Sequence, residues 1–269
     1  MKNNIVIVTS NDTLKLAKEA NIKAFLFPLK EYSVGFKKTF RIDEININNS
    51  YLYINATLTN DDISSLKHLL NNLNDNIKGI FFEDLGLLEV LKDTKLEKIL
   101  MNYHVSTNYK SINYFLDYFD DVVLSTDITK KEMEEILKKS KKKLSIYEFG
   151  KLPLMYSRRL LLTNFANYYN LPINTEKTIY EKINNESFSV LENELGTIIY
   201  SKKFYFNDLY NEKINFYIIN PLGLSEEEEK VLFTNLKNDK NILTDINIPL
   251  FNRFLNEETI YKLPAKDVI

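Results

Sequence analysis

The chain contains no cysteine and no tryptophan, and it has only six glycines, six prolines and two histidines. Without thiols it cannot form disulfides, use a thiolate nucleophile, or hold zinc or an iron–sulfur cluster through cysteine. The two histidines, His68 and His104, lie far apart and lack the short spacing of a metal-binding pair. The sequence therefore predicts no metal site.

The charged residues are almost balanced, with a formal net charge of −2 in a chain that is 27% charged and 44% hydrophobic. This balance gives no global reason to bind nucleic acid or an anionic membrane, so such binding would need a local patch. No apolar run approaches the roughly 18–20 residues that cross a bilayer, and the run at 5–8 is too short for a signal peptide. We expect a soluble, cytoplasmic protein.

Eight short apolar, β-branched or aromatic runs recur along the chain. They span residues 5–8, 24–27, 51–54, 79–82, 99–101, 122–124, 144–149 and 216–219. Their continuous hydrophobicity is typical of parallel strands that are covered on both faces. Amphipathic helical patterns lie between most of them, as at 62–73, and capping boxes are predicted at Thr129–Glu132 and Ser225–Glu228.

A strand, a turn and a helix repeated about eight times predict an α/β fold of the TIM-like (β/α)₈ barrel type over residues 1–240. A doubly wound open sheet stays an alternative, because periodicity alone does not distinguish a closed sheet from an open one. The alternation of strands and helices is interrupted after the seventh strand, which predicts an insertion at about 150–212. Within it, the runs 187–191 and 197–200 predict a β-hairpin whose turn ends at Gly196, with a positive φ.

Residues 241–269 form a C-terminal tail that is predicted to pack on the barrel or on a partner. Its apolar residues are Ile246, Ile248, Leu250, Phe251, Phe254 and Leu255, between Pro249 and Pro264. The lysine-rich stretch 138–143 is expected at a helix C-terminus, where cations offset the helix dipole, with a phosphate-contacting patch as the alternative.

In (β/α)₈ barrels the active site lies at the C-terminal ends of the strands. The polar residues at the predicted ends are Thr9, Ser10, Asn55, Glu83, Asp84, Asn102, Tyr103, His104, Ser125, Thr126, Asp127 and Glu148. His104, Asp84 and Glu148 are weak candidates for catalysis, and a solvated or hydrogen-bonded loop residue is the favoured interpretation of His104. Glu83 and Asp84 are adjacent on a strand and so face opposite sides, which predicts that one lines the mouth and the other caps the next helix.

Arg158 and Arg159 follow the seventh strand and are the main candidates for binding. Two neighbouring guanidinium groups can form a planar clamp for a carboxylate or a phosphate. The alternative is a structural salt bridge to Glu148 or to another acid at the mouth. Ser157 does not lie in a Gly-x-Ser-x-Gly elbow and has no histidine near it in sequence, which disfavours a serine hydrolase triad.

The segment 149–164 resembles the signature of the U32 peptidase (collagenase-like) family. Gly150, Tyr156, Ser157, Arg159 and Leu161-Leu162 fit that signature in register, whereas its two cysteine positions hold Pro153 and Leu160. The segments 84–86, 106–109 and 122–125 also resemble the family. Glu192-Asn193-Glu194-Leu195-Gly196-Thr197-Ile198 is similar to a run in its short members.

The resemblance implies a barrel whose site lies near 150–164, with Asn55, Tyr156, Ser157, Arg158 and Arg159 binding the substrate. The family is named for collagenase-like proteolysis, but branches of it are linked to the hydroxylation of ubiquinone precursors, ribosomal RNA and the tRNA wobble uridine. In the tRNA branch, short and long members are thought to work together, and prephenate is implicated. Cysteine-bearing members can hold an iron–sulfur cluster, which this chain cannot do.

Three hypotheses for the function stay open. The chain is a cysteine-free subunit that supports formation of 5-hydroxyuridine in tRNA, with a prephenate-like carboxylate as ligand and tRNA and a longer cysteine-bearing U32 protein as partners. Alternatively, it is a collagenase-like peptidase, and thus a hydrolase. The third hypothesis is a non-catalytic partner of a longer U32 protein.

Overall fold

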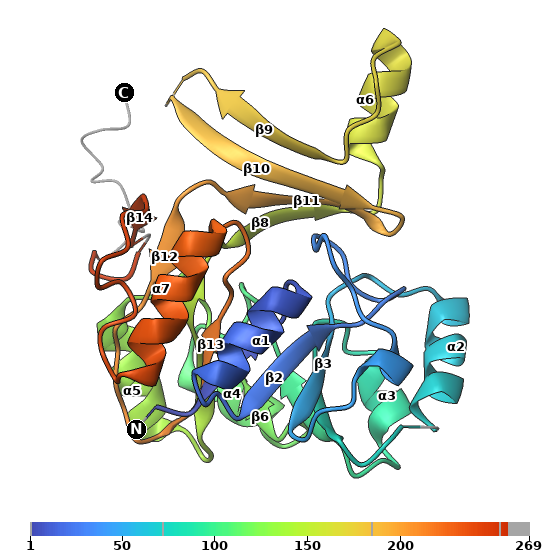
Figure 1. The fold of residues 1–269 in the computed structure, drawn as a ribbon. Helices are drawn as coiled ribbons and strands as arrows, with labels where there is room; N and C mark the ends of the chain where they lie inside the picture. Colours follow the sequence, from blue (N-terminus) through green and yellow to red (C-terminus); the bar gives the residue numbers. More distant parts are fainter. Residues whose placement is uncertain (1, 72, 184, 253, 258–269) are drawn as a thin grey trace, which may run out of the picture.

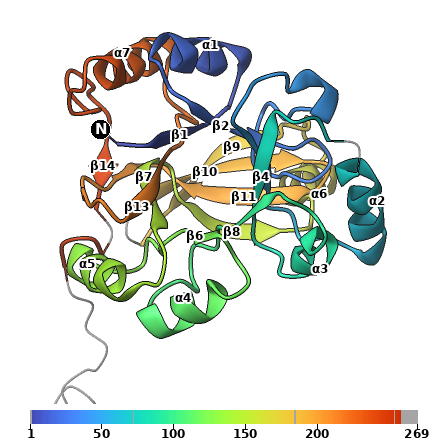
Figure 2. The ribbon, with the colours of Figure 1, turned by 90° about the horizontal axis from the view of Figure 1, so that it is seen from below.

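The computed structural model describes residues 2–71, 73–183, 185–252 and 254–257 (Figure 1). These residues form a curled ten-stranded sheet and a separate four-stranded sheet that lies across one end of the first. Helices line the outside of the curled sheet when it is viewed along its axis (Figure 2). The structure is thus a mixed α/β fold, as the sequence predicts.

Eight neighbouring strands of the curled sheet run parallel in the order β7-β13-β1-β2-β3-β4-β5-β6. Their bounds are β1 (Asn4–Ile7), β2 (Ala24–Pro28), β3 (Ser50–Ile54), β4 (Ile77–Phe82), β5 (Glu97–Leu100), β6 (Asp121–Val122), β7 (Leu144–Gly150) and β13 (Ile214–Ile219). Each of the eight predicted apolar runs overlaps one of these strands, so the strand predictions are confirmed. The short strands β12 (Phe204–Phe206) and β14 (Leu250–Phe251) extend the sheet beyond β7.

The helices of the main body begin at local capping residues where the sequence supplies them. Their bounds are α1 (Asn11–Glu19), α2 (Asn60–Leu70), α3 (Leu87–Leu91), α4 (Tyr109–Phe115), α5 (Lys130–Lys139) and α7 (Glu226–Lys237). Capping boxes at Thr129 and Ser225 are confirmed, and Thr59 forms a third that the sequence analysis did not identify. Between β2 and β3 there is only the 3₁₀ turn η1 (Ile42–Glu44). None of the helices within the described residues has the length and apolar character to cross a bilayer.

Aromatic side chains fill the inside of the curled sheet. The ring of Tyr51 on β3 lies 5.6 Å from that of Phe81 on β4 and 5.4 Å from that of Phe216 on β13, all three being buried. Because β13 and β3 are not neighbours in the sheet, these rings meet across its interior. Edge-to-face packing of this kind adds to the stabilisation that the buried area itself provides.

The two ends of the parallel row meet near β6 and β7. A single bridge joins Val123 to Ser145, and the Leu124 amide donates to the Ser145 carbonyl at 2.9 Å. Since β6 has only two residues, this contact is one bridge and not a continuous ladder. The predicted α/β fold with a parallel sheet is confirmed, whereas the complete (β/α)₈ barrel stays a prediction. The regular alternation of strands with helices is interrupted between β2 and β3 and between β7 and β13.

The insertion after β7 is larger than the predicted hairpin. The hairpin itself is present, because β10 (Glu186–Asn193) pairs antiparallel with β11 (Gly196–Ser201) and Gly196 has φ +137°. It belongs to a four-stranded antiparallel sheet in the order β8-β11-β10-β9, here called the covering sheet. The other two strands of this sheet are β8 (Pro153–Ser157) and β9 (Glu176–Glu181), and the helix α6 (Leu161–Tyr169) lies between them in the chain. The sequence analysis did not predict these three elements.

The covering sheet packs on the loops that follow the C-terminal ends of the parallel strands (Figure 1). Leu191, Ile198 and Tyr200 of the covering sheet form a small buried cluster with Val34, Ala56 and Leu222 of those loops. This contact closes the end of the curled sheet at which the sequence analysis placed the site.

The described part of the predicted tail packs against the main body. Ile242 and Leu255 are buried in the main core, and the Lys130 amide donates to the Leu255 carbonyl at 2.9 Å. Strand β14 pairs in parallel with β12. Residues 258–269 of the tail, including Pro264, lie outside the described residues.

We expect Gly150→Ala to lower the free energy of unfolding by about 1–3 kcal/mol. Gly150 has φ +138°, and a Cβ atom there would lie 2.5 Å from the Asn220 carbonyl oxygen and 2.6 Å from the Tyr147 hydroxyl. Gly86→Ala is the control. Gly86 has φ −58°, and the atom nearest to a Cβ added there would belong to the Asp84 side chain, at 3.1 Å. Urea denaturation followed by circular dichroism measures both, and equal effects would contradict the prediction.

Candidate functional site

One carboxylic acid and several tyrosines converge beneath the covering sheet. Glu83 directly follows β4 and lies on the same face as Phe81, which is paired in register with Tyr53 of β3. The Tyr53 and Tyr103 hydroxyls lie 3.3 Å apart, and the Tyr103 and Tyr147 ring centroids lie 5.8 Å apart. Residues from β3, β7 and the ends of β4 and β5 thus meet inside the mouth.

Burial determines the protonation state of Glu83 and of the tyrosines beside it. It raises the pKa of Glu83 to about 8, although hydrogen bonding by the Tyr53 hydroxyl offsets part of the effect. Burial also raises the pKa values of Tyr53 and Tyr103. Glu83 is therefore largely protonated at neutral pH, and a carboxylic acid in this state can donate a proton, or accept one after ionising. The sequence analysis noted that Glu83 and Asp84 face opposite sides but did not select Glu83.

Asp84 and Asn55 hold loops at the mouth. Asp84 accepts hydrogen bonds from the amides of Gly86 at 2.9 Å and Leu58 at 3.4 Å, so it holds the turn before α3, whose N-cap residue is Gly86. The buried Asn55 side chain accepts from the Val34 amide at 2.9 Å and donates to the Val34 carbonyl at 3.1 Å. Both polar groups are engaged with backbone.

Arg158 and Arg159 are exposed at the end of β8. In the described part of the chain neither guanidinium group forms an ion pair within 4 Å. The alternative of a salt bridge to Glu148 is wrong, because Glu148 pairs with Lys2. The neighbouring Tyr156 hydroxyl donates to the Leu195 carbonyl at 3.1 Å, and Ser157 Oγ accepts from the Arg159 amide at 3.1 Å.

The backbone that carries the two arginines is fixed by Glu192. This buried carboxylate accepts hydrogen bonds from the Leu162 amide at 2.7 Å, the Thr163 amide at 3.0 Å and the Thr163 hydroxyl at 2.5 Å. Burial alone would raise the pKa of Glu192, but hydrogen bonds from Thr163, Thr197 and the Leu162 amide together lower it. The carboxylate also lies at the N-terminus of α6, where the helix dipole favours a negative charge.

The hairpin turn supports the same segment from its other side. Thr197 Oγ1 lies 2.8 Å from both the Arg159 carbonyl and Glu192 Oε2, and it accepts from the Leu161 amide at 3.0 Å. A Cβ atom at Gly196 would collide with the Ser157 carbonyl. The run 192–197 therefore holds residues 157–163, here called the arginine segment.

The three weak catalytic candidates do not come together. Asp84 caps a turn, and His104 is an exposed loop residue whose Nδ1 lies 2.8 Å from Asp127 Oδ2. Glu148 is buried and lines a cavity of about 690 Å³ together with Lys2 and Tyr210. Burial raises the pKa of Glu148, and the charge of Lys2 opposes this effect.

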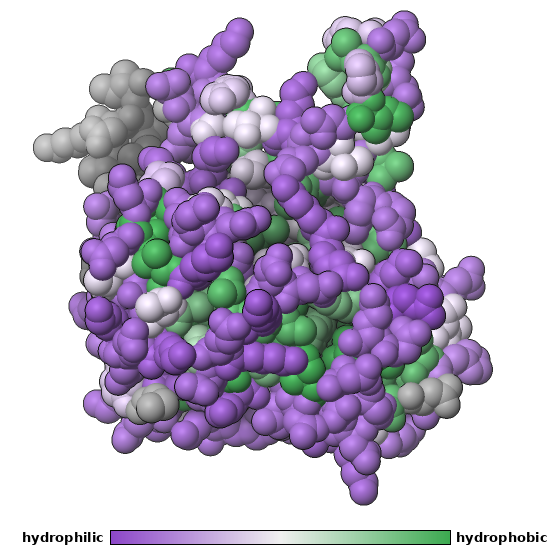
Figure 3. Space-filling model, in the orientation of Figure 1, coloured by the Kyte–Doolittle hydropathy of each residue, from purple (hydrophilic) through white to green (hydrophobic). Residues whose placement is uncertain are grey.

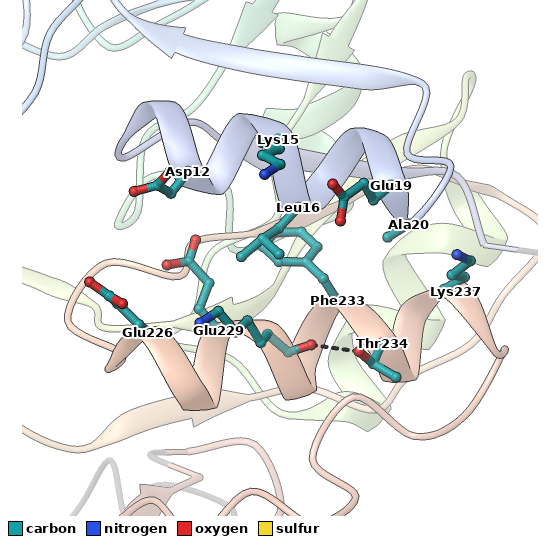
Figure 4. Close-up of a pocket in the computed structure, with 11 residues that line it drawn as sticks. Asp12, Lys15, Leu16, Glu19, Ala20, Glu226, Glu229, Phe233, Thr234 and Lys237 are labelled. Atoms are coloured by element: carbon teal, nitrogen blue, oxygen red, sulfur yellow. Dashed lines mark hydrogen bonds between the residues drawn. The ribbon is translucent and has the colours of Figure 1, made fainter.

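A groove of about 530 Å³ lies between α1 and α7 (Figure 4). Asp12, Glu226 and Glu229 gather at one end, and Leu16 and Phe233 form its apolar part. Burial and the charges of Asp12 and Glu226 raise the pKa of Glu229. The groove belongs to the outer helical layer. Within the residues that the structure describes, no group of three or more histidines or acids could hold a metal ion.

A family profile described as peptidase family U32 matches residues 12–215, from the second residue of α1 to the first residues of β13. The match covers most of the chain and includes both the arginine segment and the strands that surround Glu83. The chain belongs to peptidase family U32. Neither the curated proteins nor the solved structures give a significant match. Having no cysteine, the chain cannot ligate an iron–sulfur cluster through cysteine.

Glu192→Gln is expected to lower the free energy of unfolding by about 1–2 kcal/mol at pH 7. The amide of glutamine cannot accept all the hydrogen bonds that the Glu192 carboxylate accepts from Leu162, Thr163 and Thr197. The exposed Glu194 is the matched control, and Glu194→Gln should have little effect. The pKa of Glu192 is lower in the folded protein than in the unfolded chain. Its contribution to stability is therefore fully present at pH values above the ordinary pKa of glutamate, and it is lost as the pH falls through the pKa of the folded state. Urea denaturation at pH 7 and pH 3 checks both points, and a difference that persists unchanged at pH 3 would refute the second.

Glu83→Gln is expected to stabilise the fold at pH 8 relative to the parent chain. A folded-state pKa raised to about 8 means that the folded protein retains a proton that the unfolded chain releases near pH 4–5. Stability contributed by Glu83 is therefore complete below that range and declines, by up to about 1.4 kcal/mol per pH unit, until pH 8. The difference between the variant and the parent chain in urea denaturation at pH 5 and pH 8 isolates this residue, and a difference independent of pH would exclude it.

Proposed function

We propose that this U32 chain is a cysteine-free subunit that supports hydroxylation of the tRNA wobble uridine to 5-hydroxyuridine. Membership of the family and the similarity of segment 192–198 to the family's short members support this assignment. The lack of cysteine assigns any iron–sulfur redox step to a longer, cysteine-bearing U32 partner, and assigns binding to this chain.

The observation that best supports the proposal is the structure of the arginine segment. Its backbone is held by Glu192 and Thr197, whereas both guanidinium groups are exposed and make no ion pair with a described acid. A fixed backbone with unpaired guanidinium groups leaves both groups available for an anion, and only the two side chains have to become ordered when it binds. The proposed ligand is a carboxylate, such as a prephenate-like molecule, or a phosphate of the tRNA.

We further propose that the curled sheet works as a complete (β/α)₈ barrel with its site at the covered end. The bridge from Val123 to Ser145 supports this, since it links the two ends of the row of eight parallel strands. Glu83, protonated in the mouth, would then be the group that exchanges a proton with a bound ligand. Tyr156, Ser157 and Asn55 would shape the mouth through the loops that they hold.

The region of α6 supports the proposed partner. Residues 160–175 contain no charged residue, and several of their large side chains are exposed: Phe165, Tyr168, Tyr169, Leu171 and Ile173. Figure 3 shows apolar residues exposed on this projecting part of the molecule. An exposed apolar patch of this kind marks an interaction surface, and a longer U32 protein would cover it.

The geometry gives no support to a peptidase that uses Ser157 as its nucleophile. Ser157 Oγ accepts a hydrogen bond from the Arg159 amide, and the exposed His104 is engaged with Asp127. A serine nucleophile needs an adjacent general base, whereas the hydrogen-bond partner of Ser157 Oγ is the Arg159 amide.

Replacement of both Arg158 and Arg159 by alanine should abolish or strongly reduce 5-hydroxyuridine-derived nucleosides in tRNA. The measurement is mass spectrometry of tRNA nucleosides from a gene-deletion strain carrying the parent or the variant gene. Arg41→Ala is the matched control, because Arg41 is an exposed arginine bonded to Asp43 and lies outside the site. Unchanged nucleosides in the deletion strain would reject the function, whereas normal nucleosides in the double variant alone would reject only the role of the arginines.

A further inference from the structure

Lys151 is a buried lysine between β7 and β8, and the proposed function does not use it. The residue is only 8% exposed, and its ammonium group lies 5.3 Å from the centre of the Phe204 ring. Its side chain passes so close to Gly223 that a Cβ atom there would collide with Nζ and Cε. Lys151 is thus enclosed between the loop after β13 and the covering sheet.

No carboxylate neutralises this ammonium group. Its hydrogen-bond partner is Ser189 Oγ, at 3.3 Å, and within the described residues it forms no ion pair. Glu176 is the acid that acts on it electrostatically, but Glu176 is bound to Lys37 at 2.6 Å. An enclosed charge without a counter-ion is costly, because desolvation is not repaid by an opposite charge. Burial, followed by the charge of Lys202, lowers the pKa of Lys151.

Further lysines and two hydroxyl groups lie near the Lys151 ammonium group, since Ser189 is paired in register with Thr178. Lys202 and Lys37 are exposed and contribute two further positive charges beside the single negative charge of Glu176. Ser189 accepts from Lys151, and Thr178 Oγ1 accepts from Lys202 at 3.4 Å. The hydroxyl protons of Ser189 and Thr178 are then available to donate to an anion.

We propose that Lys151, Lys202, Ser189 and Thr178 form a site for the terminal phosphate group of a small phosphorylated ligand. Ammonium groups bind phosphate as point charges, and a terminal phosphate offers several oxygens that can accept from both lysines and from the two hydroxyl groups at once. A terminal phosphate can reach the enclosed Lys151 end-on, while a phosphodiester within a nucleic-acid backbone is extended on both sides. The site stands independently of the function proposed for the arginine segment.

The test uses inorganic phosphate and the full chain in isothermal titration calorimetry at low ionic strength. Lys151→Met and Lys202→Met should each weaken phosphate binding by at least about tenfold, equivalent to about 1.4 kcal/mol. Lys203→Met is the matched control, because Lys203 is exposed in the same turn and should change the affinity less than about twofold. Since Lys202 is at the surface, its variant remains informative if Lys151→Met fails to fold.

Two further experiments test which kind of phosphate the site binds and whether the arginine segment is involved. A nucleoside 5′-monophosphate should bind with the same dependence on Lys151 and Lys202, and an oligoribonucleotide without terminal phosphates should not. Arg158→Ala with Arg159→Ala should retain phosphate binding. The proposal is overturned if the parent chain does not bind phosphate, if Lys203→Met weakens it as much as Lys202→Met, or if the end-blocked oligoribonucleotide binds through Lys151.

Discussion

The hydrogen bonds of the buried Glu192 carboxylate hold two distant parts of the insertion together. They attach β10 to the first turn of α6, which forms the end of the arginine segment. A carboxylate that accepts several backbone and hydroxyl hydrogen bonds can remain charged in a buried position. The exposed arginines are therefore carried by a backbone that is itself held by hydrogen bonds.

The covering sheet gives the mouth its electrostatic character. Its contact with the loops around Val34, Ala56 and Leu222 removes water from the space above the parallel strands. In that setting a glutamic acid next to tyrosines keeps its proton near neutral pH, although its neighbour Asp84, bound to backbone amides, has an ordinary structural role. The two adjacent acids thus lie in different surroundings, because their side chains face opposite sides.

The sequence predicted the parallel strands well, because each of them is a continuous hydrophobic run covered on both faces. It did not predict α6, since the residue that satisfies its first turn is Glu192, about thirty positions away, and no capping residue stands before it. Similarly, the opposite orientations of Glu83 and Asp84 follow from their adjacency, but which of them faces inward depends on the pairing of β4 with β3. Lys151 was missed because its surroundings come from Gly223, Ser189 and Phe204, which are distant in sequence.

The insertion leaves and re-enters the main sheet at neighbouring positions. Strand β12, which ends it, pairs antiparallel with β7, which begins it, and Tyr205 lies opposite Gly150. Segments whose two ends lie close together can be removed from or added to a domain without displacing its framework. The covering sheet and α6 thus form a unit whose two ends meet beside β7, and we expect it to be replaceable without displacing the curled sheet.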